Sequence, residues 1–207
     1  DWDPSGQLEM HSNNVGDENI YSTFALGWVE PYYVNTEDSV TLKLRSSAYF
    51  DDAIIIKDDW NGTSMDEYIL IEYYTPHVNN KKDSDAPYPS NGKRMYTKSG
   101  FRIYHIDSRI VELSERTYQM VDYSDDIESG KSYSIGASNS QSRSSLNAHR
   151  NDYKQLHLIE AGNINTFINN KGATNQTLFT QGGLFVASKE FFYNGTSFNE
   201  GTPVSYK

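Results

Sequence analysis

The alternation of apolar and polar positions predicts a chain built mainly from short strands. Two segments carry the clearest pattern, EYILIEYYT at Glu67–Thr75 and GFRIYHID at Gly100–Asp107. Both are rich in Ile, Tyr and Phe and are bounded by turn residues, as strands are. Weaker patterns of the same kind predict further strands at Val40–Arg45, Ala53–Lys57, Ile110–Leu113, Thr117–Asp122 and Tyr153–Ala161.

Only one stretch favours a helix. In Asn19–Trp28 (NIYSTFALGW) the apolar residues fit one short helix that ends at Gly27, and Pro31 would stop any continuation. The polar stretch Pro76–Ser99 is expected to be a surface excursion, and the Ser-rich stretch Ser129–Ser145 a loop. We therefore expect a mostly-β fold, with antiparallel sheets or a β-sandwich, one short N-terminal helix and long polar loops.

Composition narrows the classes of partner. The chain has 207 residues, sixteen of them Tyr, and a formal net charge of −10. This acidic balance argues against a nucleic-acid or anionic-membrane partner, because phosphate binding needs clustered Lys and Arg. No run of about eighteen apolar residues occurs, so no membrane span is expected. The opening DWDPSG lacks the features of a signal peptide, and we expect it to lie inside a longer polypeptide.

Glu72, His105 and Asp107 place ionisable groups inside the two main strands. His105 and Asp107 are two positions apart and therefore share one face of their strand. If the strands pair, Glu72 could join them in a buried polar cluster. Such a cluster is either a metal or acid–base site, or a network that fixes strand register. We favour the network, because buried His is usually hydrogen-bonded rather than ligating.

Metal sites are restricted by the spacing of the possible ligands. None of the five His forms an HExxH pair, so the chain does not hold a complete catalytic zinc site of that type. Oxygen-rich acidic loops suit calcium, although none here has the spacing of an EF-hand. The candidate calcium ligands are Asp51, Asp52, Asp58, Asp59, Asp125, Asp126 and Glu128, and solvated acidic turns are the competing interpretation.

Several segments, taken in order, resemble one protein family. They are EMHSNNVGDENIYSTFALGW (Glu9–Trp28), DEYILIEYYT (Asp66–Thr75) with GFRIYHID, and LHLIEAG (Leu156–Gly162). Together they are similar to the region that follows the zinc-binding helix in immune inhibitor A-like secreted metallopeptidases. The resemblance implies that Met10 belongs to a Met-containing turn, which forms a soft apolar floor beneath the zinc without binding it.

The sequence also departs from the family pattern. Glu9, Ser12 and Glu18 stand where the family usually has Asp, Asp and His. These departures leave open whether the parent protein is a working or a degenerate protease. The segment that would carry the zinc ligands is absent from the sequence, so zinc binding is implied only for the intact parent, and no cofactor is assigned with certainty to this chain.

The resemblance leads to a first hypothesis about function. The chain would be the C-terminal portion of a secreted bacterial zinc metalloendopeptidase, found outside the cell or at its surface and inactive by itself. Residues 1–35 would be the post-zinc segment of the catalytic domain, and residues 36–207 a β-rich domain. Its partners would be the N-terminal catalytic segment of the same parent and a protein or peptide substrate.

Two alternatives remain open. One is a non-enzymatic β-sandwich module that binds surface glycans or proteins through exposed aromatic residues such as Tyr88 and Tyr96. The other is a degenerate protease that is retained as a scaffold.

Overall fold

The computed structural model describes most of the chain from residue 15 onward. The described residues are 15–35, 37–86, 94–113, 118–121, 127–137, 139, 154–162, 164, 166–167, 171–183, 185, 191–193 and 196–198. Of these, residues 118–120, 191–193 and 196–198 are described by their backbone alone. Met10, Tyr88, Asp125 and Asp126, which the sequence analysis singled out, lie outside the described residues.

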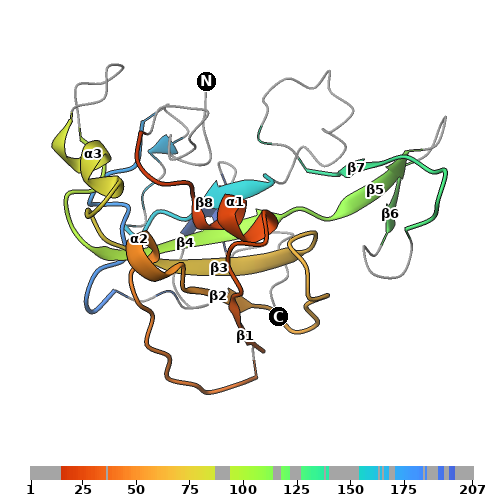
Figure 1. Cartoon of the computed structure of the whole chain (residues 1–207), viewed down its shortest axis with the longest axis horizontal. Helices are drawn as coiled ribbons and strands as arrows, with labels where there is room; N and C mark the ends of the chain where they lie inside the picture. The colour runs from red at the N-terminus through yellow and green to blue at the C-terminus, as the bar shows by residue number, and fades with distance from the viewer. Residues whose placement is uncertain are drawn as a thin grey trace.

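A five-stranded sheet forms the centre of the molecule (Figure 1). Its strand order is β1-β2-β3-β4-β8. The first two strands are parallel, and every other neighbouring pair is antiparallel. The strands are β1 (Tyr32–Val34), β2 (Ala53–Ile56), β3 (Glu67–Tyr74), β4 (Gly100–Asp107) and β8 (Leu156–Leu158).

Two smaller sheets and three short helices complete the described structure. The antiparallel sheet β6-β5-β7 consists of β5 (Ile110–Leu113), β6 (Tyr118–Val121) and β7 (Tyr133–Ile135). The second small sheet pairs β9 (Phe191–Tyr193) with β10 (Thr196–Phe198). The helices are α1 (Ile20–Ala25), α2 (Ser47–Phe50) and α3 (Asn80–Asp85), none of them long and apolar enough to cross a membrane. The predicted mostly-β fold is confirmed.

The central pair β3–β4 is in register over its whole length, from Glu67 opposite Asp107 to Tyr74 opposite Gly100. Because side chains alternate along a strand, this register assigns every residue of the pair to one of two faces. One face carries Tyr68, Leu70, Glu72 and Tyr74 of β3 with Arg102, Tyr104 and Ile106 of β4; the other carries Glu67, Ile69 and Ile71 of β3 with Ile103, His105 and Asp107 of β4.

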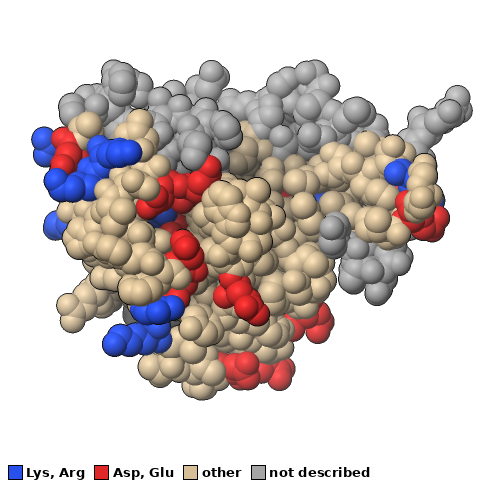
Figure 2. Space-filling view, in the orientation of Figure 1, with Lys and Arg blue, Asp and Glu red and all other residues tan. Residues whose placement is uncertain are grey.

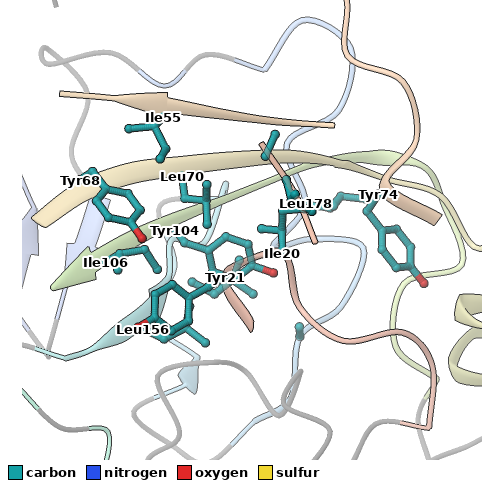
Figure 3. Packing of buried hydrophobic residues seen from close by; sticks show 14 of the residues in the cluster. Ile20, Tyr21, Ile55, Tyr68, Leu70, Tyr74, Tyr104, Ile106, Leu156 and Leu178 are labelled. Carbon is teal, nitrogen blue, oxygen red and sulfur yellow. The ribbon is translucent and has the colours of Figure 1, made fainter. Parts of the chain in front are cut away.

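Helix α1 covers the first of these faces. Ile20 and Tyr21 belong to the same buried cluster as Leu70 and Tyr104 of the sheet (Figure 3). The helix begins where the Asn19 side chain accepts a hydrogen bond from the Ser22 backbone, at 2.9 Å. Gly27 follows its end with a φ of +74°, a conformation that glycine adopts without strain. Residues from both sides of the expected domain boundary after residue 35 therefore share one core.

The second face holds an apolar pocket of about 500 Å³. Val40, Leu42 and Leu44 line it together with Ile71 and Ile103. The prediction of a strand at Val40–Arg45 is wrong, because this segment is irregular and pairs with no strand of the described sheets. Its alternating apolar residues contact an apolar surface of the sheet instead. Such contact produces the same sequence pattern without backbone hydrogen bonds to a neighbouring strand.

Three further expectations need correction. The stretch Pro76–Ser99 contains helix α3, and the Ser-rich stretch 129–145 contains strand β7. Tyr96 was expected at the surface, but it is fully buried, and its hydroxyl lies 3.1 Å from that of Thr177. In each case a polar neighbourhood in the sequence concealed a regular element or a buried residue.

Candidate functional site

The predicted cluster of Glu72, His105 and Asp107 is divided between the two faces of the sheet. His105 and Asp107 share a face, as expected, but the register places Glu72 opposite Arg102 on the other face. Glu67, which lies opposite Asp107, takes the place that we had assigned to Glu72. The three predicted residues are all buried, so their burial was predicted correctly and their grouping was wrong.

We call Glu67, His105, Asp107 and Arg109 the Glu67 cluster. His105 Nε2 lies 3.1 Å from Glu67 Oε1, and Arg109 Nη2 lies 2.5 Å from Glu67 Oε2. Arg109 also donates two hydrogen bonds to Asp107, each of 2.9 Å, one from Nε and one from Nη2. This bidentate geometry gives Arg–carboxylate pairs their strength and their fixed orientation. The cluster therefore has the contacts of a network that fixes strand register.

A second network anchors the turn that precedes β3. Lys57 forms an ion pair with Asp66, whose Oδ1 also accepts a hydrogen bond of 2.8 Å from the Glu67 backbone. The Ser108 backbone donates to the Asp66 carbonyl at 3.0 Å. These contacts join the turn to both central strands next to the Glu67 cluster, so this end of the sheet is held by polar contacts as well as by apolar packing.

Glu72 has a different set of partners. Arg102 Nη2 lies 2.7 Å from Glu72 Oε1, and the Tyr104 hydroxyl donates to the same oxygen at 3.0 Å. The Arg102 guanidinium also lies 4.9 Å from the centre of the Tyr74 ring. Burial lowers the pKa of Arg102, but the charge and hydrogen bond of Glu72 act together with Tyr104 and Tyr96 in the opposite direction, and the pKa is raised overall. The pKa of Tyr104 is raised mainly by burial.

Sequence reasoning missed Arg102. Its signal was available, because Arg102 is the one basic residue in the otherwise apolar first half of GFRIYHID. A buried arginine requires an acidic partner, and Glu72 is the one charged residue in the ILIEYY half of the neighbouring strand. Pairing those two charges would have indicated the correct register.

An acidic pocket of about 270 Å³ opens next to Glu72. It is lined by Asp17, Glu18, Ile20, Thr23, Trp28, Ser47, Ala48, Asp51, Glu72 and Asn80. Four of these lining residues are acidic, and none of the described lining residues is Lys or Arg. Figure 2 shows acidic side chains gathered on this side of the molecule, over the region between α1, α2 and α3. Its lining is far more acidic than that of the apolar pocket on the other face, and we take it as the candidate site.

The neighbouring residues Asp51 and Asp52 have pKa values that are shifted in opposite directions. Asp51 lines it, and its pKa is raised by burial, followed by the charges of Asp17, Glu72 and Asp52. The pKa of Asp52 is lowered, because its carboxylate accepts hydrogen bonds from the Arg45 side chain at 2.8 and 2.9 Å. Like-charge repulsion from Asp17, Glu72 and Asp52 therefore acts on Asp51 in addition to its partial burial.

The candidate calcium ligands do not gather into one site within the described residues. Asp52 binds Arg45, and Glu128 forms an ion pair with Lys131 at 3.2 Å. Asp58 is half-buried and Asp59 is exposed on the turn after β2. Across the described ranges, no three His, Asp or Glu side chains are placed to hold a metal ion.

Comparison with known proteins gave no relative: no family model, curated protein or solved structure matches this chain.

Proposed function

We propose that this chain is the C-terminal portion of a secreted zinc metalloendopeptidase, in which it completes and stabilises the catalytic domain. One observation carries the proposal. The segments on which the resemblance rests lie far apart in the sequence, yet α1, β3, β4 and β8 contribute to a single buried core. Segments that belong to one functional unit are expected to pack together in this way.

The acidic pocket supports the same proposal. Asp17 and Glu18 line the pocket and follow Met10, the residue matched to the Met-containing turn, by only seven and eight positions. The pocket would therefore adjoin the catalytic cleft of the parent enzyme. The resemblance implies that the zinc and its ligands would come from the preceding segment of the parent. This chain would supply the wall and the support of the cleft.

The proposal is tested by comparing two proteins in a casein-cleavage assay. The full-length protein, expressed from the complete reading frame that encodes this chain, is expected to cleave casein, and a chelator is expected to abolish the activity. The 207-residue chain alone is expected to be inactive. Cleavage by the chain alone would contradict the proposal, as would a reading frame without an HExxH motif upstream of Asp1.

A non-enzymatic binding module is the second candidate, and exposed aromatic side chains favour it. Trp28 is 66% exposed, and Tyr49 and Phe50 are 57% and 52% exposed. Aromatic rings on a surface make good contacts with sugars and peptides. Tyr96, by contrast, is buried and cannot serve as such a platform. Binding of a surface polysaccharide by the chain alone, lost in Trp28→Ala and kept in Tyr96→Phe, would favour this candidate over the peptidase.

A further inference from the structure

Helix α3 is hydrogen-bonded to residues 15–17, which lie more than sixty residues earlier in the chain. The Asp83 carboxylate accepts two hydrogen bonds from consecutive backbone amides, one of 2.8 Å from Val15 and one of 2.9 Å from Gly16. One oxygen serves each amide, so both oxygens of the carboxylate are engaged. Hydrogen bonds between a carboxylate and backbone amides are among the stronger ones in proteins, because one partner is charged.

Two asparagines extend these contacts to Asp17. Asn80 Oδ1 accepts a hydrogen bond of 3.2 Å from the Asp17 backbone, and Asn79 Nδ2 donates one of 2.8 Å to the Asp17 carboxylate. Asp17 and Asn80 both line the acidic pocket. These two contacts therefore hold Asp17, which forms part of the pocket wall, through both its backbone and its side chain.

The sequence of α3 suits this role better than it suits packing in a core. Its buried residues are Asn80, Asp83 and Ser84, all of them polar, whereas Lys81 and Lys82 are exposed. A helix that stabilises a protein by apolar burial presents an apolar stripe to the core. The buried face of α3 presents hydrogen-bonding groups instead, and two of them, from Asn80 and Asp83, contact residues 15–17.

Gly16 fits the same interpretation from the other side of the contact. A Cβ atom at this position would lie 2.2 Å from Asp83 Oδ2, far closer than two such atoms can approach. A residue without a side chain is therefore needed for the carboxylate to reach the backbone. Both partners of the contact have the residue types that it requires.

We infer that α3 is a positioning element for the acidic pocket, with Asp83 as its positioning residue. By fixing residues 15–17, it sets Asp17 in the pocket wall and holds the start of the segment that leads into α1. The inference rests on the proposed function in one respect, namely that the pocket adjoins the catalytic cleft. The connection between β3 and β4, which contains α3, would then contribute directly to the geometry of the site.

Hydrogen exchange in the 207-residue chain tests the hydrogen bonds between Asp83 and residues 15–16 independently of enzymatic activity. Asp83→Asn keeps the size of the side chain but offers an NH₂ group to one of the two amide donors. We expect the amides of Val15 and Gly16 to exchange about tenfold faster or more in this variant. Asp85→Asn is the matched control, because Asp85 lies on the same helix and pairs with Lys81 at the surface. Unchanged exchange at Val15 and Gly16 would overturn the inference.

Kinetics of the full-length protein then separate positioning from mere support. At an unchanged unfolding temperature, Asp83→Asn should lower kcat by about tenfold, and Asp85→Asn should leave it unchanged. An unchanged kcat in Asp83→Asn would refute the positioning role. An inactive wild type would refute the proposed function instead, and the exchange experiment would still decide whether α3 holds residues 15–17.

If Asp83→Asn fails to fold, Asn79→Ala allows the same two measurements. Asn79 is exposed and contributes one contact to Asp17, so the change should be tolerated and should give smaller effects in the same direction. Unchanged exchange at Asp17 in Asn79→Ala would overturn the inference in that case.

Discussion

The Glu67 cluster and the acidic pocket place carboxylates on opposite faces of the same strand pair, with different electrostatic balance. In the Glu67 cluster, Arg109 contacts both carboxylates and His105 contacts one of them. In the acidic pocket, the described lining residues include four acids and no Lys or Arg; Glu72 pairs with Arg102 behind it, and Asp17 accepts a hydrogen bond from Asn79. One group of carboxylates includes a cation that contacts both of its members, whereas the other has no Lys or Arg among its described lining residues.

This difference separates a structural role from a role in binding. A buried charge is tolerated when it is paired and hydrogen-bonded, and its partners then fix the register of the strands that carry them. Unbalanced negative charge in a concave site raises the local concentration of cations, including basic side chains of a ligand. The Glu67 cluster accordingly behaves as part of the framework, whereas the acidic pocket is suited to a positively charged group.

The largest expected effect comes from removing the cation behind the pocket. Arg102→Met would leave Glu72, which is 1% exposed, without a charged partner. Loss of one member of a buried ion pair costs about 3–5 kcal/mol in the free energy of unfolding, measured by urea denaturation. The double variant Glu72→Met with Arg102→Met should recover most of this loss, because no unpaired charge remains. A single variant that loses less than about 1 kcal/mol would show that Arg102 does not stabilise Glu72.

A smaller loss is expected when the Glu67 cluster is broken. His105→Ala removes one contact to Glu67, but Arg109 still pairs with both carboxylates. We expect a loss of about 1–3 kcal/mol in urea denaturation. His77→Ala is the matched control, because His77 is exposed and should change stability by less than about 0.5 kcal/mol. Equal effects of the two substitutions would mean that His105 is not part of a buried, satisfied network.

The paired Asp52 is expected to stabilise the chain above its ordinary pKa. Arg45 lowers the pKa of Asp52 from 3.8, so its contribution is fully present above pH 3.8 and is lost as the pH falls through the lowered value. Asp52→Asn should therefore lower the unfolding temperature at pH 7, by an amount equivalent to about 1 kcal/mol, and by progressively less as the pH falls below 3.8. Thermal unfolding across this pH range measures the difference. A deficit that is equally large at acid pH would rule out the ion pair as its cause.

The smallest effect, with the opposite sign, is expected at Asp51. Its raised pKa means that ionisation opposes folding, so its contribution is present below pH 3.8 and is lost as the pH rises through the raised value. Asp51→Asn should raise stability at pH 7 by a few tenths of a kcal/mol, as is usual for surface substitutions, and leave it unchanged near pH 3. Asn also tolerates the φ of +53° at this position. If Asp51→Asn destabilises the chain as Asp52→Asn does, the two carboxylates do not differ as described.

Local pattern was sufficient for the strands and helix with the strongest periodicity. The predicted bounds Gly100–Asp107 coincide with β4, and the predicted strand at Glu67–Thr75 differs from β3 by one residue. Asn19 and Gly27 marked the two ends of α1, because capping depends on residues that are neighbours in the chain. Helix α3 was missed because its buried face is polar and gives no apolar periodicity.

The sequence by itself determined the mostly-β class, the main strands and the shared face of His105 and Asp107, because alternation along a strand is a local property. Only the tertiary structure decided that Glu67 rather than Glu72 joins them. Register is a relation between strands, and a shift of one residue would exchange the two faces. The acidic pocket was likewise decided by tertiary structure, because Asp17, Asp51, Glu72 and Asn80 come from separate segments that only the packing of α1, α2 and α3 around the sheet brings together.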